Sequence, residues 1–193
     1  MNPSPEIKTV DEANIITGLS FGANLGNAPD AVERAIAAVA ALPRTHLKHR
    51  SSLYRTEPWG GVPQDWFINS AAIYVTSLPP FDLLAGCQAI EQAIGRLPTQ
   101  PKGPRVIDID IIFYGEIRLE KSDLTIPHRH YKERGFVLQP LLEIAPDLCI
   151  GGEKISHTLA RLGPDTLQVQ LIPNSQPIQD LEDLSDPLAS TIP

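Results

Sequence analysis

Two aspartates in the segment "GPRVIDIDII" (103–112) are the side chains of this chain best suited to chemistry. The segment is otherwise rich in β-branched residues, which favours a β-strand. Because side chains alternate between the two faces of a strand, Asp108 and Asp110 point the same way, roughly 6–7 Å apart at the backbone. Two bare charges at that spacing repel by roughly 2–3 kcal/mol at an effective dielectric constant of about 20. Solvent, basic side chains or bound cations should therefore offset this repulsion.

The surroundings of the aspartates leave two interpretations open. One is an ordinary solvated strand face, with Ile107, Ile109 and Ile111 facing the core on the other side. The other is a divalent-cation site, because hard cations bind carboxylate oxygens. Basic residues occur on both sides of the pair in the sequence: Arg96, Arg105, His128, Arg129, His130, Lys132 and Arg134. Carboxylates, cations and arginines together suit metal-assisted phosphoryl transfer, although the pattern alone also occurs in plain surface strands.

A second group of residues suits a flat, polar ligand. Aromatic and amide side chains lie at or beside predicted loops at Trp59, Trp66, Phe67, Asn69 and Phe136. Aromatic rings beside an amide can stack on a heterocycle and hydrogen-bond its edge, although each such residue alone is more often part of a core.

The segment "GANLGN" (22–27) could suggest a phosphate-binding loop. It lacks both the spacing and the Lys-Ser/Thr pair of a Walker loop. We therefore expect a turn in which glycine lets the backbone approach other elements closely.

The elements that must position these residues are predicted from hydrophobic periodicity and from proline and glycine boundaries. Helices are predicted at residues 29–43 and 80–95, and strands at 14–22, 47–56, 67–77 and 103–112. The order strand, helix, strand, strand, helix, strand predicts an α+β fold with a ferredoxin-like βαββαβ core. In that arrangement the antiparallel sheet carries helices on one face and leaves the other open for ligands. Further elements are expected as C-terminal additions.

The composition indicates one domain. A chain of 193 residues can bury a core of its own, which we place at residues 14–172. Residues 1–13 are predicted to form a flexible leader. Residues 173–193 contain acidic residues but no Lys or Arg and are predicted to form a disordered tail.

Charge, cysteine content and hydropathy exclude several classes of protein. A net charge of −7 argues against a nucleic-acid partner bound by a basic surface. The two cysteines are far apart, which argues against a disulfide framework or a zinc site. The chain has neither an apolar run of transmembrane length nor a signal-peptide core. We expect a cytoplasmic monomer with small-molecule substrates and no membrane partner.

Several segments taken in order resemble a known family. They are "GANLGN", "YRTEPWG", "QDWFINSA", "IEQAIGR", "GPRVIDIDII" and "IPHRHYKERGFVLQPLLEIAP". This set resembles the 6-hydroxymethyl-7,8-dihydropterin pyrophosphokinases of folate biosynthesis over about residues 14–172. The combination of "GPRxxDxDI" with "PHxxxxxRGF" is the most specific part. The family is ferredoxin-like, which agrees with the predicted element order.

The resemblance implies a reaction and a metal site. ATP would donate its β,γ-pyrophosphate to the hydroxymethyl oxygen of the dihydropterin, giving AMP. Two Mg²⁺ ions would be held by Asp108 and Asp110 and would bridge the triphosphate. Arg96 and Arg105 match the arginines that grip and neutralise the transferring phosphoryl groups. The pattern does not identify a general base.

The resemblance also implies two binding surfaces. Phe67 and Phe136 match the pair of rings that encloses the pterin. Asn69 and the backbone around Thr56, Pro58 and Trp59 match the polar edge that recognises it. The residues that match the ATP side or its surroundings are Gln88, Glu91, Ile111, Thr125, His128 and Arg134.

The connection between Arg96 and Gly103 departs from the family pattern. It is about a residue shorter than in relatives, and Lys102 stands where an aromatic residue can occur. In the family this loop closes over the nucleotide. Two other functions fit part of the pattern: a different Mg²⁺-dependent phosphoryl or nucleotidyl transferase, and a non-catalytic pterin- or nucleotide-binding module. A chain of this length is expected to carry the one activity only.

Overall fold

A computed structural model describes residues 14–58, 63–97, 103–163, 169–173 and 175–179. The predicted leader, Trp59, residues 98–102 of the connection after Arg96, and residues 180–193 of the predicted tail lie outside this part. No helix within the described ranges is long and apolar enough to cross a bilayer.

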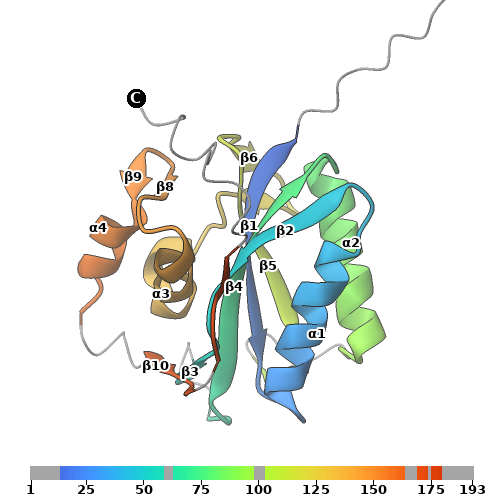
Figure 1. The fold of residues 1–193 in the computed structure, drawn as a ribbon, viewed down its shortest axis with the longest axis vertical. Helices are drawn as coiled ribbons and strands as arrows, with labels where there is room; N and C mark the ends of the chain where they lie inside the picture. Colours follow the sequence, from blue (N-terminus) through green and yellow to red (C-terminus); the bar gives the residue numbers. More distant parts are fainter. Residues whose placement is uncertain (1–13, 59–62, 98–102, 164–168, 174, 180–193) are drawn as a thin grey trace, which may run out of the picture.

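The elements follow one another in an order close to the predicted one (Figure 1). They are β1 (Ile15–Ala23), α1 (Ala28–Ala40), β2 (Thr45–Arg50), β3 (Tyr54–Thr56), β4 (Phe67–Thr76), α2 (Pro80–Ile94), β5 (Asp108–Tyr114), β6 (Leu119–Glu120), β7 (Thr125–Ile126), the 3-10 turn η1 (Tyr131–Glu133), α3 (Gly135–Ile144), β8 (Cys149–Ile150), β9 (Glu153–Lys154), α4 (Ile155–Ala160), β10 (Val169–Leu171) and β11 (Ile178–Gln179). The single strand predicted over residues 47–56 is divided into β2 and β3.

The main sheet is antiparallel, with β1 and β4 as neighbouring inner strands. β5 pairs with one side of β1 and β4 with the other, while β2 and β3 both pair with β4. The register places Gly22 between Asn69 and Asp108, and Ser20 between Ala71 and Asp110. Since directly opposed residues in adjacent strands share a face, these two rows define one patch of the sheet.

Helices α1 and α2 cover one face of the sheet (Figure 1). Asn27 caps α1 by accepting a hydrogen bond from the Asp30 backbone, and Val32, Ile36 and Val39 are buried beneath it. Gly95 ends α2 in a left-handed conformation with φ +112°. Ile107, Ile109 and Ile111 lie in the same core, so the predicted inward face of the aspartate strand is confirmed.

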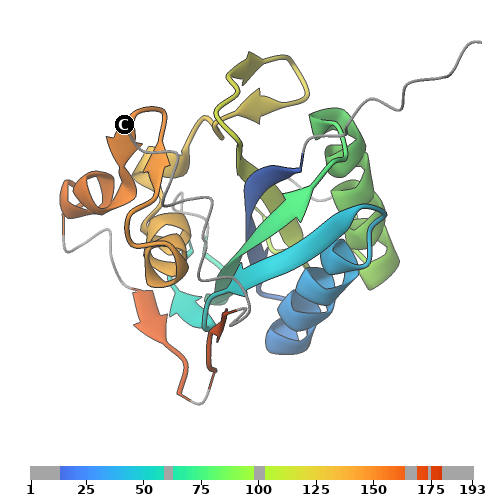
Figure 2. The same ribbon diagram turned by 45° about the horizontal axis from the view of Figure 1, so that its top comes forward.

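The second face of the sheet is only partly open, which corrects the expectation that helices lie on one face alone. Helix α3 packs against it and α4 packs on α3, which forms a second core with Leu138 and Leu141 of α3 fully buried (Figure 2). Helix α3 continues through Pro140. Ile112 and Phe113 belong to this second core, because a bulge opposite Gly18 and Leu19 interrupts the alternation of β5.

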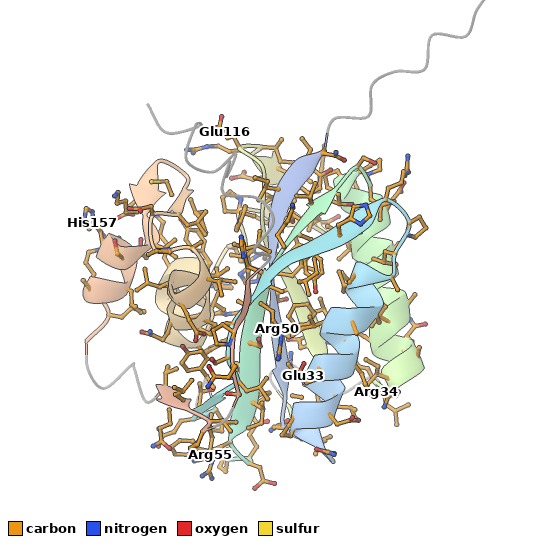
Figure 3. The ribbon with its side chains drawn as sticks, viewed as in Figure 1. Glu33, Arg34, Arg50, Arg55, Glu116 and His157 are labelled. Carbon is orange, nitrogen blue, oxygen red and sulfur yellow. The ribbon has the colours of Figure 1, made fainter. Side chains whose placement is uncertain are left out.

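The C-terminal segment pairs with the edge of the sheet. β10 pairs with β3, and β11 pairs with β2. Arg50 of β2 forms an ion pair with Glu33 of α1 and donates a hydrogen bond to the Gln176 carbonyl oxygen at 3.3 Å (Figure 3). The structure therefore differs from the prediction of a disordered tail at residues 175–179.

Candidate active site

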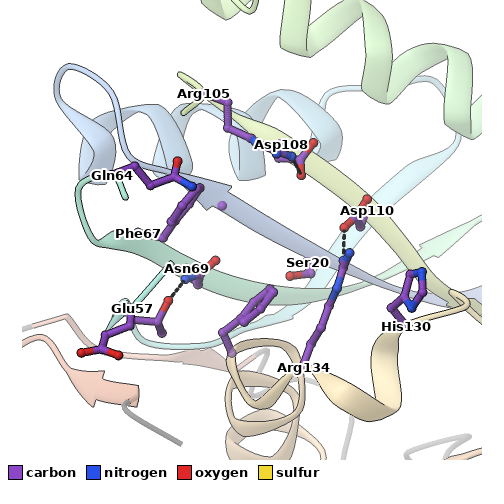
Figure 4. A pocket seen from close by; sticks show the side chains of 13 residues that line it. Ser20, Glu57, Gln64, Phe67, Asn69, Arg105, Asp108, Asp110, His130 and Arg134 are labelled. Carbon is purple, nitrogen blue, oxygen red and sulfur yellow. Dashed lines mark hydrogen bonds and ion pairs between the residues drawn. The ribbon is translucent and has the colours of Figure 1, made fainter. Parts of the chain in front are cut away.

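A cavity of about 350 Å³ opens on the face of the sheet opposite α1 and α2. Residues of β1, β4 and β5 and residues at the start of α3 line it (Figure 4). Eight residues predicted from the sequence are brought together there: Thr56, Phe67, Asn69, Arg105, Asp108, Asp110, Arg134 and Phe136. The cavity has an acidic half and a neutral half, which are formed by different kinds of side chain.

The acidic half of the cavity consists of Asp108 and Asp110 with Arg105 and Arg134, and Arg96 pairs with Asp108 from outside the described lining. Arg96 Nη1 lies 2.7 Å from Asp108 Oδ1, and Arg105 forms an ion pair with the other oxygen of that carboxylate. Arg134 Nη1 donates to Asp110 Oδ2 at 2.9 Å. Basic side chains therefore offset the repulsion between the two carboxylates. Burial, and then the charge of Asp110, still raises the pKa of Asp108 above its ordinary value, against the opposing effect of Arg105 and Arg96.

Glu91 stabilises the acidic half through contacts with Arg96 and with the backbone of β5. Its side chain is 9% exposed, forms an ion pair with Arg96 and accepts a hydrogen bond from the Ile109 backbone at 2.7 Å. The left-handed turn at Gly95 brings the chain back so that the Arg96 backbone N–H donates to the Glu91 carbonyl oxygen. Burial is the main cause that raises the pKa of Glu91 to about 6. Glu91 thus holds both Arg96 and the first residues of β5 in place.

The neutral half of the cavity consists of Thr56, Phe67, Asn69 and Phe136. Phe67 and Asn69 are two residues apart on β4 and therefore share a face. Asn69 Nδ2 donates to Thr56 Oγ1 at 2.7 Å, which fixes the orientation of the amide. Phe136 extends from the first turn of α3, and the Arg134 guanidinium lies 5.7 Å from the centre of its ring. Two aromatic rings and an oriented amide are thus presented to one cavity.

A comparison with known protein families decides between the interpretations of this site. A profile described as 7,8-dihydro-6-hydroxymethylpterin-pyrophosphokinase (HPPK) matches residues 18–146, which include both halves of the cavity. The chain belongs to this family. The resemblance noted in the sequence is therefore confirmed.

Similar HPPK sequences occur among named bacterial proteins. A 2-amino-4-hydroxy-6-hydroxymethyldihydropteridine pyrophosphokinase of Methylorubrum extorquens is 45% identical over 150 residues, covering 78% of this chain and 95% of the relative. A protein of the same name from Pseudomonas aeruginosa is 41% identical over 130 residues, covering 67% of this chain and 80% of that protein.

Solved structures support the HPPK fold. A Plasmodium falciparum HPPK-DHPS triple mutant superposes with a TM-score of 0.61 over 78% of this chain at 16% identity. This chain covers 44% of that longer protein. At so low an identity the likeness shows the fold alone: mixed α and β structure with an antiparallel sheet.

The donor set of the HPPK cavity fits a magnesium ion that is held jointly with a substrate. In the described part of the chain, no three His, Cys, Asp or Glu side chains gather in a group that could hold a metal by themselves. Mg²⁺ is commonly bound by one or two carboxylates together with substrate phosphates, which matches a pair such as Asp108 and Asp110.

Several predicted residues lie outside the described lining of the cavity. Ile111 is 3% exposed in the core beneath α1 and α2, so its side chain faces away from the aspartates. Gln88 is exposed on α2, and Pro58 follows β3 in a half-buried position. These residues could reach a ligand only through the backbone or from the edge of the site.

His128 lies along the margin of the acidic half, and Thr125 lies outside the described lining. His128 Nε2 is 3.9 Å from Asp110 Oδ2. Burial is the main cause that lowers the pKa of His128 to about 4, so the imidazole is neutral at pH 7. Thr125 in β7 accepts a hydrogen bond from Arg129 at 3.3 Å.

Several residues of the site were missed in the sequence. Ser20, Gly22, Glu57 and Gln64 line the cavity, and His130 had been noted only as one of several basic residues. Ser20 and Gly22 have no chemical signal of their own, because the register of β1 against its two neighbours brings them to the cavity floor. Gln64 is the first residue of the "QDWFINSA" segment, which was the available sign for it.

Proposed function

We propose that this chain transfers the pyrophosphoryl group of ATP to the hydroxymethyl group of 6-hydroxymethyl-7,8-dihydropterin, giving AMP and the pterin diphosphate. Membership of the HPPK family makes it an ATP-dependent pyrophosphokinase of folate biosynthesis. The observation that carries the proposal is the union of the acidic and neutral halves in one cavity. A general phosphoryl or nucleotidyl transferase would need the first half only.

The neutral half binds the pterin in this proposal. Phe67 and Phe136 pack on the ring faces, where aromatic contacts are favourable. Asn69 uses one Nδ2 hydrogen on Thr56, which leaves a second amide hydrogen and the Oδ1 lone pairs for the edge of the heterocycle. Pro58 and Trp59, in the segment after Thr56, complete that edge.

The acidic half binds the phosphates. Asp108 and Asp110 hold two Mg²⁺ ions, which neutralise charge on the triphosphate. Each guanidinium has five N–H donors, and the ion pairs with the carboxylates use only some of them. Arg96 and Arg105 can therefore keep an aspartate and also bind a phosphate oxygen, while Arg134 holds Asp110 beside them. Their effect on the transfer is positioning and charge stabilisation.

The nucleotide lies beside the acidic half, with Thr125 and His128 on its side of the sheet and Gln88, Glu91 and Ile111 in the surroundings. A neutral His128 suits this role, because it can donate or accept a hydrogen bond without adding charge. Glu91 acts through Arg96, since its own carboxylate is bonded to the protein.

The remaining predictions form part of the same proposal. Residues 14–172 form a ferredoxin-like pyrophosphokinase domain with C-terminal additions, supported by the strand order β5, β1, β4 and then β2 with β3. The protein acts as a cytoplasmic monomer on small molecules, without a nucleic-acid or membrane partner.

Product analysis tests the proposed reaction. The protein is incubated with ATP, Mg²⁺ and 6-hydroxymethyl-7,8-dihydropterin, and the nucleotides are separated by chromatography. AMP and pterin diphosphate in equal amounts are expected. ADP, or inorganic phosphate without pterin diphosphate, would favour the general transferase, and pterin binding without any turnover would favour the non-catalytic module.

A further inference from the structure

Asn24 lies immediately after β1, in the segment first considered as a phosphate loop. Its side chain is buried, with the residue 7% exposed, and it stands behind the described lining of the cavity. Its amide nevertheless contacts two segments that do belong to the site. The first contains Arg105 and the second contains Gln64 and Asp65.

The contacts with Arg105 involve the backbone of both residues. The Asn24 backbone N–H donates to the Arg105 carbonyl oxygen at 3.0 Å, and the Arg105 N–H donates to Asn24 Oδ1 at 2.8 Å. The Arg105 guanidinium in turn pairs with Asp108. Asn24 therefore fixes the backbone from which an arginine of the acidic half extends.

The contacts with the second segment use the amide nitrogen. Asn24 Nδ2 donates to Gln64 Oε1 at 3.0 Å and to the Asp65 carbonyl oxygen at 3.1 Å. Gln64 lines the cavity, and Phe67 of the neutral half follows three residues later. A backbone N–H can only donate and a backbone carbonyl can only accept, so the amide has one orientation that satisfies both segments.

We infer that Asn24 is a positioning residue that ties the neutral half of the cavity to the acidic half. The role rests on the proposed function, because the two halves hold the acceptor and the donor of the same transfer. The hydrogen-bond groups of this one amide set the distance between the segments. A displacement of about 1 Å in such an arrangement can slow a reaction about 100-fold.

The substitution Asn24→Asp should keep the contact with Arg105 and remove the contact with Asp65. A carboxylate can still accept the hydrogen bond from the Arg105 N–H, but it has no hydrogen for the Asp65 carbonyl oxygen. We expect the KM for the pterin to rise at least about tenfold, within the range that misplacement produces. The dissociation constant of a nonhydrolysable ATP analogue should stay within about twofold of the wild-type value, because the Arg105 side is preserved.

Asn27→Asp is the matched control. The same chemical change is made three residues later, at an exposed N-cap where aspartate caps as well as asparagine. Its kinetic constants should be those of the wild type. A pterin KM for Asn24→Asp within twofold of the wild type would overturn the inference, as would an equal loss of affinity for both substrates.

Hydrogen exchange keeps this test separate from the test of the reaction. If the wild type releases no AMP, the proposed reaction fails, but the connection can still be measured. Faster amide exchange at residues 63–67 in Asn24→Asp, with unchanged exchange at 105–110, supports the role of Asn24. Unchanged exchange at both segments would overturn it.

Discussion

The two halves of the cavity differ in the interactions that hold their side chains in place. In the acidic half, three guanidiniums surround two carboxylates, and the contacts are ion pairs. In the neutral half, a hydrogen bond between Asn69 and Thr56 orients one amide beside two aromatic rings. The acidic half can accept phosphates and cations because its charges already have partners that can be shared. The neutral half can select a ligand by shape because its groups are fixed before binding.

The two halves also differ in what a substitution should change. Loss of a charge in the acidic half leaves an arginine without its counterion and weakens stabilisation of the transferring group. A change in the neutral half alters mainly the contacts with the pterin. We therefore expect the first to affect kcat and the second to affect the KM for the pterin.

The largest effect should follow from Asp110→Asn. The amide keeps the shape of the side chain but loses the charge that faces Arg134, and kcat should fall about 1,000-fold, as for other preorganised electrostatic groups. The pterin dissociation constant should stay within about threefold, because the neutral half is intact. Steady-state kinetics and calorimetric titration with the pterin measure the two quantities.

Glu153→Gln is the control for loss of a carboxylate. Glu153 also pairs with two basic side chains, Lys132 and Arg161, but on the surface of the protein. Its removal should leave kcat unchanged. A kcat for Asp110→Asn within tenfold of the wild type would show that the carboxylate pair does not hold the metal.

The acidic half should also leave a signature in the pH dependence of stability. Folded Glu91 has a pKa of about 6, against an ordinary value of 4.5, so the folded chain holds more protons than the unfolded chain between these values. The free energy of unfolding should therefore fall by about 2 kcal/mol as the pH rises from 4.5 through 6. Glu91→Gln should lack this fall.

Chemical denaturation at several pH values measures the difference. Relative to the wild type, Glu91→Gln should gain about 2 kcal/mol between pH 4.5 and 7, on top of a constant change from the lost pair with Arg96. Glu116→Gln, which removes an exposed carboxylate, serves as the control. If the free energy of unfolding changes with pH in the same way in the wild type and in Glu91→Gln, folding does not raise the pKa of Glu91.

A smaller effect is expected from Phe136→Leu in the neutral half. Leucine keeps most of the apolar surface and loses the ring, so the contact specific to stacking, about 0.5–1.5 kcal/mol, should disappear. The KM for the pterin should rise up to about tenfold with kcat nearly unchanged. Phe81→Leu, at a ring that is 45% exposed on α2, is the control. A fall in kcat without a change in KM would remove the distinction between the halves.

The sequence predicts the parts of the site that depend on local pattern. The alternation in "VIDID" correctly places the aspartates opposite Ile107 and Ile109, and proline and glycine mark the ends of α1 and α2. The same alternation assigns Ile111 to the core, whereas the family resemblance assigned it to ATP binding.

The parts that the sequence did not predict depend on contacts between distant segments. The register that places Gly22 beside Asn69 and Asp108 is set by strands far apart in the chain. The hydrogen bond between Asn24 and Arg105 joins residues separated by 81 positions. Helix α3 closes part of the second face because its apolar residues find a partner in the sheet, which outweighs the local effect of Pro140.

The smallest effect tests the boundary between the two halves. Gly22 lies between Asn69 and Asp108, and a Cβ at Gly22 would lie 2.9 Å from Asn69 Oδ1. In Gly22→Ala the Asn69 amide must move and weaken its hydrogen bond with Thr56, whose net contribution is about 1 kcal/mol. The KM for the pterin should therefore rise up to about fivefold.

Gly86→Ala is the matched control for this substitution. Its Cβ would meet Leu42 Cδ1 at the same distance, 2.9 Å, but on α2 and away from the cavity. Both variants introduce an equally close contact, so their difference isolates the position of Asn69. If Gly22→Ala lowers kcat and leaves the pterin KM unchanged, the added methyl group acts on Asp108 instead. Gly22 would then belong to the acidic half of the cavity, and the boundary between the two halves would lie between β1 and β4.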